Sequence, residues 1–199
     1  EWVWVKGSIG KNDKQQSTTA NMENGDNNEN KKGSDDQIQQ DGFADSTPRQ
    51  LAQFHITVTA KLRLSTLVSF LVQRVSKGER TVVFMATCAS VDFHHKLFEV
   101  MDPLWDDNNE DSSKKGLFGT KGQVFKLHGN VQHSKRNETL KHFDNAVGGA
   151  ILLTTDVAAR GLNLEGVDWT IQYDPPCEIA DYVHRVGRVA RAGKAGHSL

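Results

Sequence analysis

The segment YVHRVGRVARAG, residues 182–193, holds one histidine and three arginines within eight positions and no acidic residue among them. Its spacing predicts a helix over 178–191, with four apolar residues facing the sheet: Ile179, Val183, Val186 and Ala190. His184, Arg188 and Arg191 then share a second face of that helix. A solvated basic face is one interpretation, because cations near a helix C-terminus suit the helix dipole. Guanidinium groups without acidic neighbours favour another, a phosphate supplied from outside.

Two further segments place polar residues directly after a predicted buried strand. ILLTTDVAARGLNLEGV (151–167) runs into a helix start capped near Asp156, where backbone N–H groups can bind an anion. LHGNVQHSKR (127–136) repeats this order, and Lys135 and Arg136 lie in a first helical turn whose dipole they oppose. An external phosphate explains these cations better than helix stability does. Each segment taken singly is also compatible with an ordinary strand-to-helix turn.

The apolar pattern between the polar segments predicts alternating helices and strands. The expected helices cover 61–78, 90–101, 133–145 and 178–191, and the expected strands cover 81–86, 123–129, 150–155 and 169–173. This alternation predicts an α/β fold, with a parallel sheet covered by helices on both faces. Ligands of such sheets bind beyond the carboxyl ends of the strands. We therefore expect the residues after Leu127, Thr155 and Tyr173 to lie at one functional edge.

Composition narrows the class of protein. Residues 6–47 are rich in Asn, Gln, Lys, Asp, Ser and Gly, which predicts a disordered segment, and 102–122 is expected to be a polar surface loop. Without these acidic tracts the remainder is basic, a hint of nucleic-acid binding. No apolar run is long enough for a membrane span. Cys88 and Cys177 are too few for a disulfide framework, so we expect reduced thiols inside a cell, and the histidines show no metal-ligand spacing.

LHG…R, TTDVAARGLN and HRVGRVARAG, in this order and spacing, resemble the second RecA-like domain of DEAD-box RNA helicases over 48–199. ITVTAKLRLSTLVSFL, VVFMATCASVDFHHKLFEVM and QYDPPCEIADYVHRVGR look like the nucleolar subgroup that acts in assembly of the large ribosomal subunit. EWVWV (1–5) is similar to the end of the first helicase domain, which makes 6–47 an interdomain insertion. The final HSL looks like the beginning of the domain's last strand, so we expect that strand to be truncated.

The resemblance implies that ATP with Mg²⁺ binds between two RecA-like domains. The first domain would hold the magnesium, and neither G-x-x-x-x-G-K-[ST] nor D-E-A-D occurs in this sequence. Arg188 and Arg191 match the family's two arginine fingers. His184 matches the residue that couples ATP to RNA, and Arg160 matches the arginine that bridges to the first domain. Asn163 stands where an aspartate usually contacts the ribose.

The resemblance also implies an RNA-binding surface that contacts the RNA backbone without reading its sequence. Five positions match the family's RNA contacts: Gly129, His133, Arg136, Thr155 and Gly161. His133 replaces a usual glutamine, although Gln132 is adjacent. Val189 replaces a usual threonine between the fingers, and we expect any impairment of catalysis to arise there first.

The main hypothesis is the C-terminal domain of a monomeric ATP-dependent RNA helicase in the nucleolus. Its partners would be pre-ribosomal RNA and the N-terminal RecA-like domain of the same protein, with no membrane involved. We expect negligible ATPase activity from this chain alone. The alternative is a non-catalytic RNA-binding or scaffold domain of the same fold, which Asn163 and Val189 support. A DNA helicase or remodeller is a third hypothesis, but the glutamine-rich form of the last motif is missing.

Overall fold

The structure is a computed structural model, and it describes residues 5–7, 50–104, 116–118, 123–159, 164, 166–189 and 195–199. Its strands are β1 (Val5–Gly7), β2 (Leu51–His55), β3 (Arg80–Phe84), β4 (Gln123–Leu127), β5 (Ala150–Thr154), β6 (Trp169–Gln172) and β7 (Gly196–Ser198). Its α-helices are α1 (Arg63–Ser76), α2 (Cys88–Leu104), α3 (His133–Asn145), α4 (Asp156–Ala159) and α5 (Ile179–Val186), and a short 3-10 helix (Ala60–Leu62) precedes α1.

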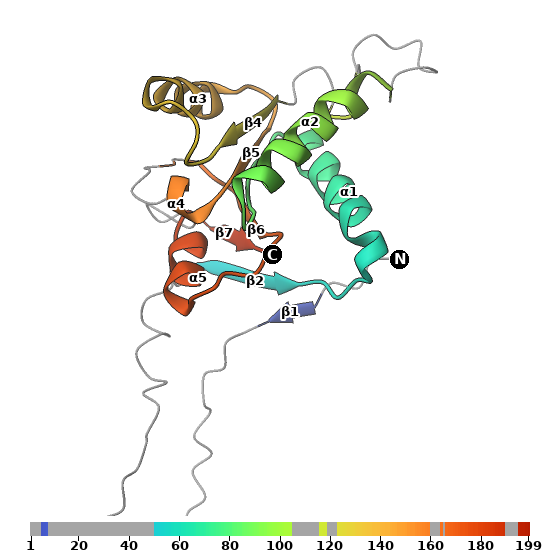
Figure 1. Cartoon of the computed structure of the whole chain (residues 1–199). Helices are drawn as coiled ribbons and strands as arrows, with labels where there is room; N and C mark the ends of the chain where they lie inside the picture. The colour runs from blue at the N-terminus through green and yellow to red at the C-terminus, as the bar shows by residue number, and fades with distance from the viewer. Residues whose placement is uncertain are drawn as a thin grey trace, which may run out of the picture.

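The strands form one sheet in the order β1-β2-β7-β6-β3-β5-β4. β1 pairs antiparallel with β2, and every other pairing in the described sheet is parallel. The helices pack on both faces of the sheet, with α1 and α2 on one side and α3, α4 and α5 on the other (Figure 1). The predicted α/β fold with a parallel sheet between two helical layers is therefore confirmed.

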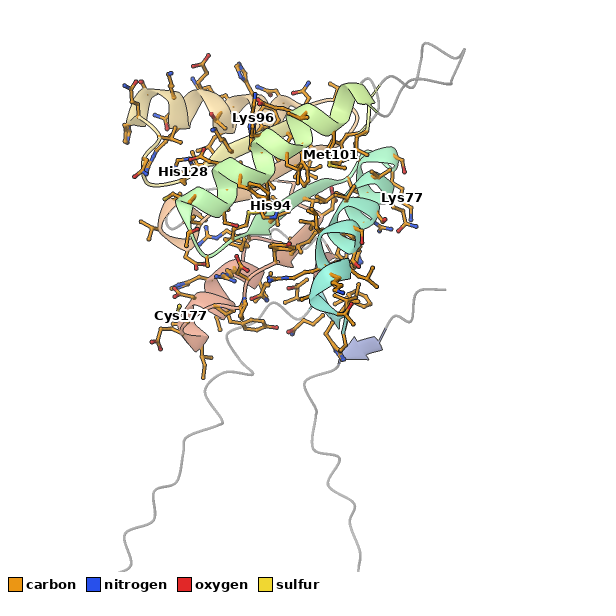
Figure 2. All side chains as sticks on the ribbon, turned by 45° about the vertical axis from the view of Figure 1, so that its right-hand side comes forward. Lys77, His94, Lys96, Met101, His128 and Cys177 are labelled. Atoms are coloured by element: carbon orange, nitrogen blue, oxygen red, sulfur yellow. The ribbon has the colours of Figure 1, made fainter. Side chains whose placement is uncertain are left out.

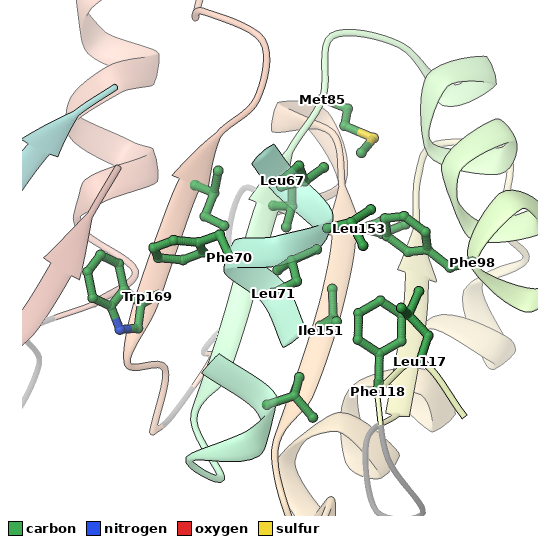
Figure 3. Close-up of a cluster of buried hydrophobic side chains, with 14 of the residues drawn as sticks. Leu67, Phe70, Leu71, Met85, Phe98, Leu117, Phe118, Ile151, Leu153 and Trp169 are labelled. Carbon is green, nitrogen blue, oxygen red and sulfur yellow. The ribbon is translucent and has the colours of Figure 1, made fainter. Parts of the chain in front are cut away.

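Alternation along the strands divides the core into two clusters. In β5, Ile151 and Leu153 face α1 and α2, whereas Leu152 packs on the opposite face. Figure 3 shows the first cluster, in which Leu67 and Leu71 of α1 lie against these strand residues. Because each fully buried side chain of this size contributes about 1.5–3 kcal/mol, the two clusters together hold the strands in register.

The helix α1 follows the predicted periodicity. Its apolar residues at helical spacing are buried, namely Leu67, Val68, Leu71 and Val75, and Leu64 packs partly against the core. The helix ends before Gly78, whose φ of 75° favours glycine. A second glycine, Gly149, lies so close to this turn that a β-carbon on it would be 2.8 Å from the Val75 carbonyl oxygen.

The expected surface loop 102–122 differs from the structure in its described part. Helix α2 continues to Leu104, three residues into that range. Leu117 and Phe118 are buried, and the Phe118 ring lies 5.4 Å from the Phe98 ring. This pair of apolar residues therefore brings the segment back to the core. The expected insertion 6–47 lies outside the described residues, apart from the end of β1.

Candidate functional site

The segments that carry the candidate residues meet at one edge of the sheet. Leu127 of β4 and Phe84 of β3 are both level with Thr154 of β5, and Phe84 is level with Gln172 of β6. The carboxyl ends of four parallel strands therefore reach the same height. This confirms the expectation that the residues after Leu127, Thr155 and Tyr173 share an edge.

The helix at the opening basic segment is shorter than expected. It covers Ile179–Val186, with Gly187 as its C-cap, in place of the predicted 178–191. The prediction that Ile179 faces the sheet is wrong, because this side chain is 63% exposed. The face that is buried carries Asp181, Arg185 and Val186. Arg188 therefore follows the helix, which removes the predicted helical face shared with His184.

Arg185 is a charged residue on the buried face of this helix. It is 2% exposed, and its Nε and Nη2 atoms each donate to a carboxylate oxygen of Asp156 at 2.6 Å. Its Nη1 atom donates to the Asp174 carbonyl at 2.6 Å, and the guanidinium lies 5.2 Å from the Phe84 ring centre. A bidentate pair of this kind stabilises a buried cation that would otherwise be very costly. The anion for this arginine is therefore inside the domain, which corrects the expectation of unpaired cations.

Asp156 is used differently from the predicted cap. It is the first residue of α4 and its carboxylate binds Arg185, so the start of α4 is joined to the last turn of α5. Thr155, one of the predicted RNA contacts, directly precedes it and is 6% exposed. The Asp156–Arg185 pair therefore connects a candidate RNA segment to the candidate ATP segment.

Asp174 joins further elements at the same edge. Its carboxylate accepts hydrogen bonds from Arg63 of α1 at 2.7 Å and from the backbone N–H of Ala86 at 2.9 Å. The Arg63 guanidinium also lies 4.1 Å above the Tyr173 ring. Together with the Arg185 contact, these interactions fix the segment after β6 against α1 and α5.

The candidate ATP-side residues are only partly within the described chain. His184 is exposed, and the Nε atom of Arg188 donates to the His184 carbonyl at 3.1 Å. These two residues line one small pocket together with Asp156 and Asp181. Arg188 therefore has a hydrogen-bond acceptor within the domain. The other predicted ATP-side residues lie outside the described residues: Arg160, Asn163 and Arg191.

The candidate RNA-side residues after β4 form an ordered turn. Arg136 closes it, because Nη2 donates to the carbonyls of His128 at 3.2 Å and Gly129 at 3.1 Å, and Nε donates to that of Val131 at 3.1 Å. The sequence did not predict this internal role. His133 is exposed at the start of α3, whereas Gly161 lies outside the described residues.

Gly129 is open to the outside of this turn. A β-carbon placed on it would meet no atom within 4 Å. Its φ is not in the left-handed region, so the fold itself does not require glycine here. The absence of a side chain leaves room for an external molecule to approach the backbone.

A polar cluster between α2 and β4 was not predicted. Asp92 accepts from Lys126 at 2.6 Å and from His128 at 3.1 Å. The hydrogen bond from Lys126 is the main reason that the pKa of Asp92 is lowered, with His128 adding to it. Figure 2 shows His128 near α2. The two ion pairs of this cluster hold the end of β4 against α2.

Burial affects the pKa of His95, a second titratable residue of α2. Burial lowers its pKa, and this effect outweighs the attraction of Glu99, whose carboxylate lies 3.4 Å away. Its neighbour His94 contacts the Ser90 carbonyl through Nδ1 at 2.8 Å. Within the described residues no group of three or more His, Cys, Asp or Glu side chains could hold a metal ion. Within the same residues no helix is long and apolar enough to cross a membrane.

Known proteins share this sequence pattern. The family model for the helicase conserved C-terminal domain matches residues 62–193. The chain is 41% identical over 155 residues to DEAD-box ATP-dependent RNA helicase 17 of Oryza sativa subsp. japonica, covering 76% of this chain and 26% of the relative. It is 37% identical over 173 residues to ATP-dependent RNA helicase dbp7 of Schizosaccharomyces pombe, covering 80% and 24%. The chain thus spans about a quarter of the length of these relatives.

Solved structures share the fold. Mss116p DEAD-box helicase domain 2 bound to an RNA duplex has a TM-score of 0.51 at 27% identity, covering 68% of this chain and 48% of that one. The E. coli DEAD-box protein SrmB, bound to regulator of ribonuclease activity A, has a TM-score of 0.50 at 28% identity, covering 71% of each chain. With the family match over most of the chain, these findings show that the chain belongs to the helicase C-terminal domain family, as the second RecA-like domain of a DEAD-box protein.

Proposed function

We propose that the whole protein is an ATP-dependent RNA helicase and that this chain supplies one side of its ATP site and half of its RNA-binding surface. The observation that carries this proposal is the shared edge. The three segments that resemble the family's motifs all begin at the carboxyl ends of neighbouring parallel strands. Ligands of open α/β sheets bind at that edge.

On the ATP side, we assign Arg188 and Arg191 as arginine fingers and Asn163 as the ribose contact. His184 and Arg160 would couple the ATP site to RNA and to the first domain. In the described part of this edge, His184 and Arg188 line a small pocket together with Asp156 and Asp181. The Mg²⁺ that accompanies ATP would be held by the other domain. Bound ATP would supply the γ-phosphate, and the guanidinium groups would stabilise the negative charge that develops on it during transfer to water.

The ATP side is tested by turnover in the full-length protein. Arg188→Ala should lower kcat by about 10³-fold or more, because an arginine finger acts on the transition state. Lys77→Ala is a suitable control, since this exposed lysine follows α1 at the opposite end of the sheet. The isolated chain should show negligible ATPase activity. RNA-stimulated hydrolysis by the isolated chain, or unchanged turnover in the Arg188 variant, would refute this assignment.

On the RNA side, we assign Gly129, His133, Arg136, Thr155 and Gly161 to the RNA backbone. Gly129→Ala tests this in the chain itself, because the added methyl group meets no protein atom. Binding of single-stranded RNA should weaken about tenfold, the value of one lost hydrogen bond to a charged phosphate. Fluorescence anisotropy at fixed salt measures this, and thermal unfolding should be unchanged. If the Gly129→Ala variant binds RNA as tightly as the unchanged chain, RNA does not bind at this turn.

A non-catalytic RNA-binding scaffold is the second candidate function. It rests on Asn163 and Val189, which depart from the family pattern. Val189 is 1% exposed and packs in the cluster with Phe84, so an apolar side chain suits this position. This weakens the argument that a hydroxyl is needed there. ATPase measurements on full-length protein with and without Asn163→Asp separate the candidates, because a scaffold would bind RNA without turnover.

The cellular assignment rests on the resemblance alone. We propose pre-ribosomal RNA as the substrate, the nucleolus as the location, and a monomer that works with its own N-terminal RecA-like domain. A fluorescent fusion of the full-length protein should concentrate in nucleoli, and the protein should co-sediment with pre-ribosomal particles. A uniformly cytoplasmic signal would contradict this assignment.

A further inference from the structure

His128 is a buried histidine at the carboxyl end of β4, and neither the ATP side nor the RNA side as proposed gives it a role. It is 5% exposed and lies beside α2, as Figure 2 shows. Its Nε2 atom lies 3.1 Å from the Asp92 carboxylate, whereas its Nδ1 atom is buried and has no hydrogen-bond partner within the described residues. A buried polar atom without a partner costs stability. Histidine is therefore a poor choice if this position only has to pack against α2.

Asp92 determines which nitrogen of this ring carries a proton. The hydrogen bond from Lys126 at 2.6 Å is the main cause of the lowered pKa of Asp92, so the Asp92 side chain is a carboxylate that only accepts hydrogen bonds. The Nε2 atom of His128 must then carry a proton and donate to Asp92. Because Asp92 belongs to α2, this hydrogen bond fixes the ring of His128 relative to that helix.

The backbone of the same residue begins the turn that carries Gly129. The His128 carbonyl accepts a hydrogen bond from Val131 N–H at 3.0 Å, which closes a four-residue turn, and another from Arg136 Nη2 at 3.2 Å. The ring of His128 is thus held by α2, and its carbonyl is held by α3. A shift of His128 would move Gly129, which is the next residue and is open to an external molecule.

Stability alone does not explain a histidine at this position. The ion pair between Lys126 and Asp92 already joins β4 to α2 without any contribution from His128. An apolar side chain of similar size would leave no buried nitrogen without a partner. What the histidine adds is a fixed direction for its own ring and for the backbone that follows it.

We propose that His128, oriented by Asp92, is a positioning residue that holds the Gly129 turn in the shape that receives the RNA backbone. This inference rests on the proposed RNA-binding surface and adds to it a residue that does not itself touch RNA. Because the ring is buried, it acts on RNA through the turn. RNA affinity therefore depends on residue 128 only while the Gly129 turn makes its contact.

The test compares two replacements of His128 in the chain, using fluorescence anisotropy with single-stranded RNA at fixed salt. His128→Leu removes the hydrogen bond to Asp92 and should weaken RNA binding about five- to tenfold, close to the loss expected for Gly129→Ala. His128→Gln keeps an N–H donor for Asp92, so its RNA affinity should stay within about twofold of the unchanged chain. In urea unfolding His128→Leu should be at least as stable as His128→Gln, because leucine buries no polar atom.

A double variant shows whether His128 acts through the turn. In the Gly129→Ala background, His128→Leu should change RNA affinity by less than about twofold, because the contact that His128 positions is already lost. His142→Leu is the matched control, since it removes an exposed histidine near the other end of α3. This control should bind RNA as tightly as the unchanged chain.

The outcomes separate this inference from the proposed RNA surface. Unchanged RNA affinity in His128→Leu, with weaker binding in Gly129→Ala, would overturn the positioning role alone. Unchanged affinity in both variants would overturn the RNA surface and the positioning role together. Additive losses from His128→Leu and Gly129→Ala, or losses of RNA affinity that merely follow losses of stability, would also overturn the positioning role.

Discussion

The ion pair between Arg185 and Asp156 makes a strong prediction about stability. Arg185→Met removes two hydrogen bonds of 2.6 Å to the carboxylate and one of 2.6 Å to the Asp174 carbonyl. Breaking a buried pair by removing one partner costs about 3–5 kcal/mol. The Asp156 side chain is 23% exposed, so water can partly rehydrate it. We therefore expect the lower value, about 3 kcal/mol, for this variant.

The reverse change should cost more. Asp156→Ala leaves a guanidinium that is 2% exposed and cannot lose its proton, for which we expect about 4 kcal/mol. Combining Arg185→Met with Asp156→Ala removes both charges, and the double variant should be more stable than the sum of the two single effects predicts, by about 2 kcal/mol or more. This order of costs follows from the unequal exposure of the two partners.

The assay is urea unfolding followed by circular dichroism. The slope of the unfolding free energy against urea concentration should be the same for all variants. Arg188→Met is the matched control, because this arginine lies three positions away and its Nε atom donates to an exposed backbone carbonyl. We expect it to cost about 1 kcal/mol or less. A cost below about 1 kcal/mol for Arg185→Met, or additive single effects, would refute the reasoning.

Three further predictions concern other parts of the molecule. Gly149→Ala should destabilise the fold by about 2 kcal/mol or more in urea unfolding, because φ at this residue is 96° and the new β-carbon would lie 2.8 Å from the Val75 carbonyl oxygen. Gly129→Ala is the control for this variant and should leave stability nearly unchanged. Val189→Thr should cost about 1–3 kcal/mol in the same assay, since it buries a hydroxyl in an apolar cluster, and a neutral result would show that a partner exists. The pKa of His95 is lowered by burial, so the unfolded chain binds more protons just below its usual pKa, and stability should fall as pH falls from about 7 to about 5. His95→Gln should lose less stability over that range, and a parent and variant with the same pH dependence would contradict this sign.

The apolar pattern of the sequence correctly predicted the helices and strands whose bounds depend on residues close by in the chain. Helix α3 has the predicted bounds, His133–Asn145, and the four buried strand runs are strands within one or two residues. Gly78 follows the end of α1, and its φ of 75° suits a residue without a side chain. The common edge followed from parallel strands, which start and end at the same level once their apolar runs are in register.

Features that depend on distant partners could not be predicted in this way. Arg185 is buried in an ion pair with Asp156, which lies 29 positions away in sequence, so no local pattern could show that Arg185 and not Ile179 would be buried. Strand β2 was not predicted, since its pairing with β7 joins the two ends of the domain. The hydrogen bonds from Arg136 to three carbonyls were not predicted either, because these acceptors lie in a turn whose shape the sequence does not give.

The contacts of Asp174 have a consequence for motion within the domain. This residue binds Arg63 at the start of α1, the turn before α2 through Ala86 N–H, and Arg185 in α5. A local opening that moves the Asp174 segment would therefore disturb α1 and α5 together, so the two helices should open as one cooperative unit. Native-state hydrogen exchange would then give both helices the same opening free energy. A ligand held at the carboxyl edge would slow exchange in α1 without touching it.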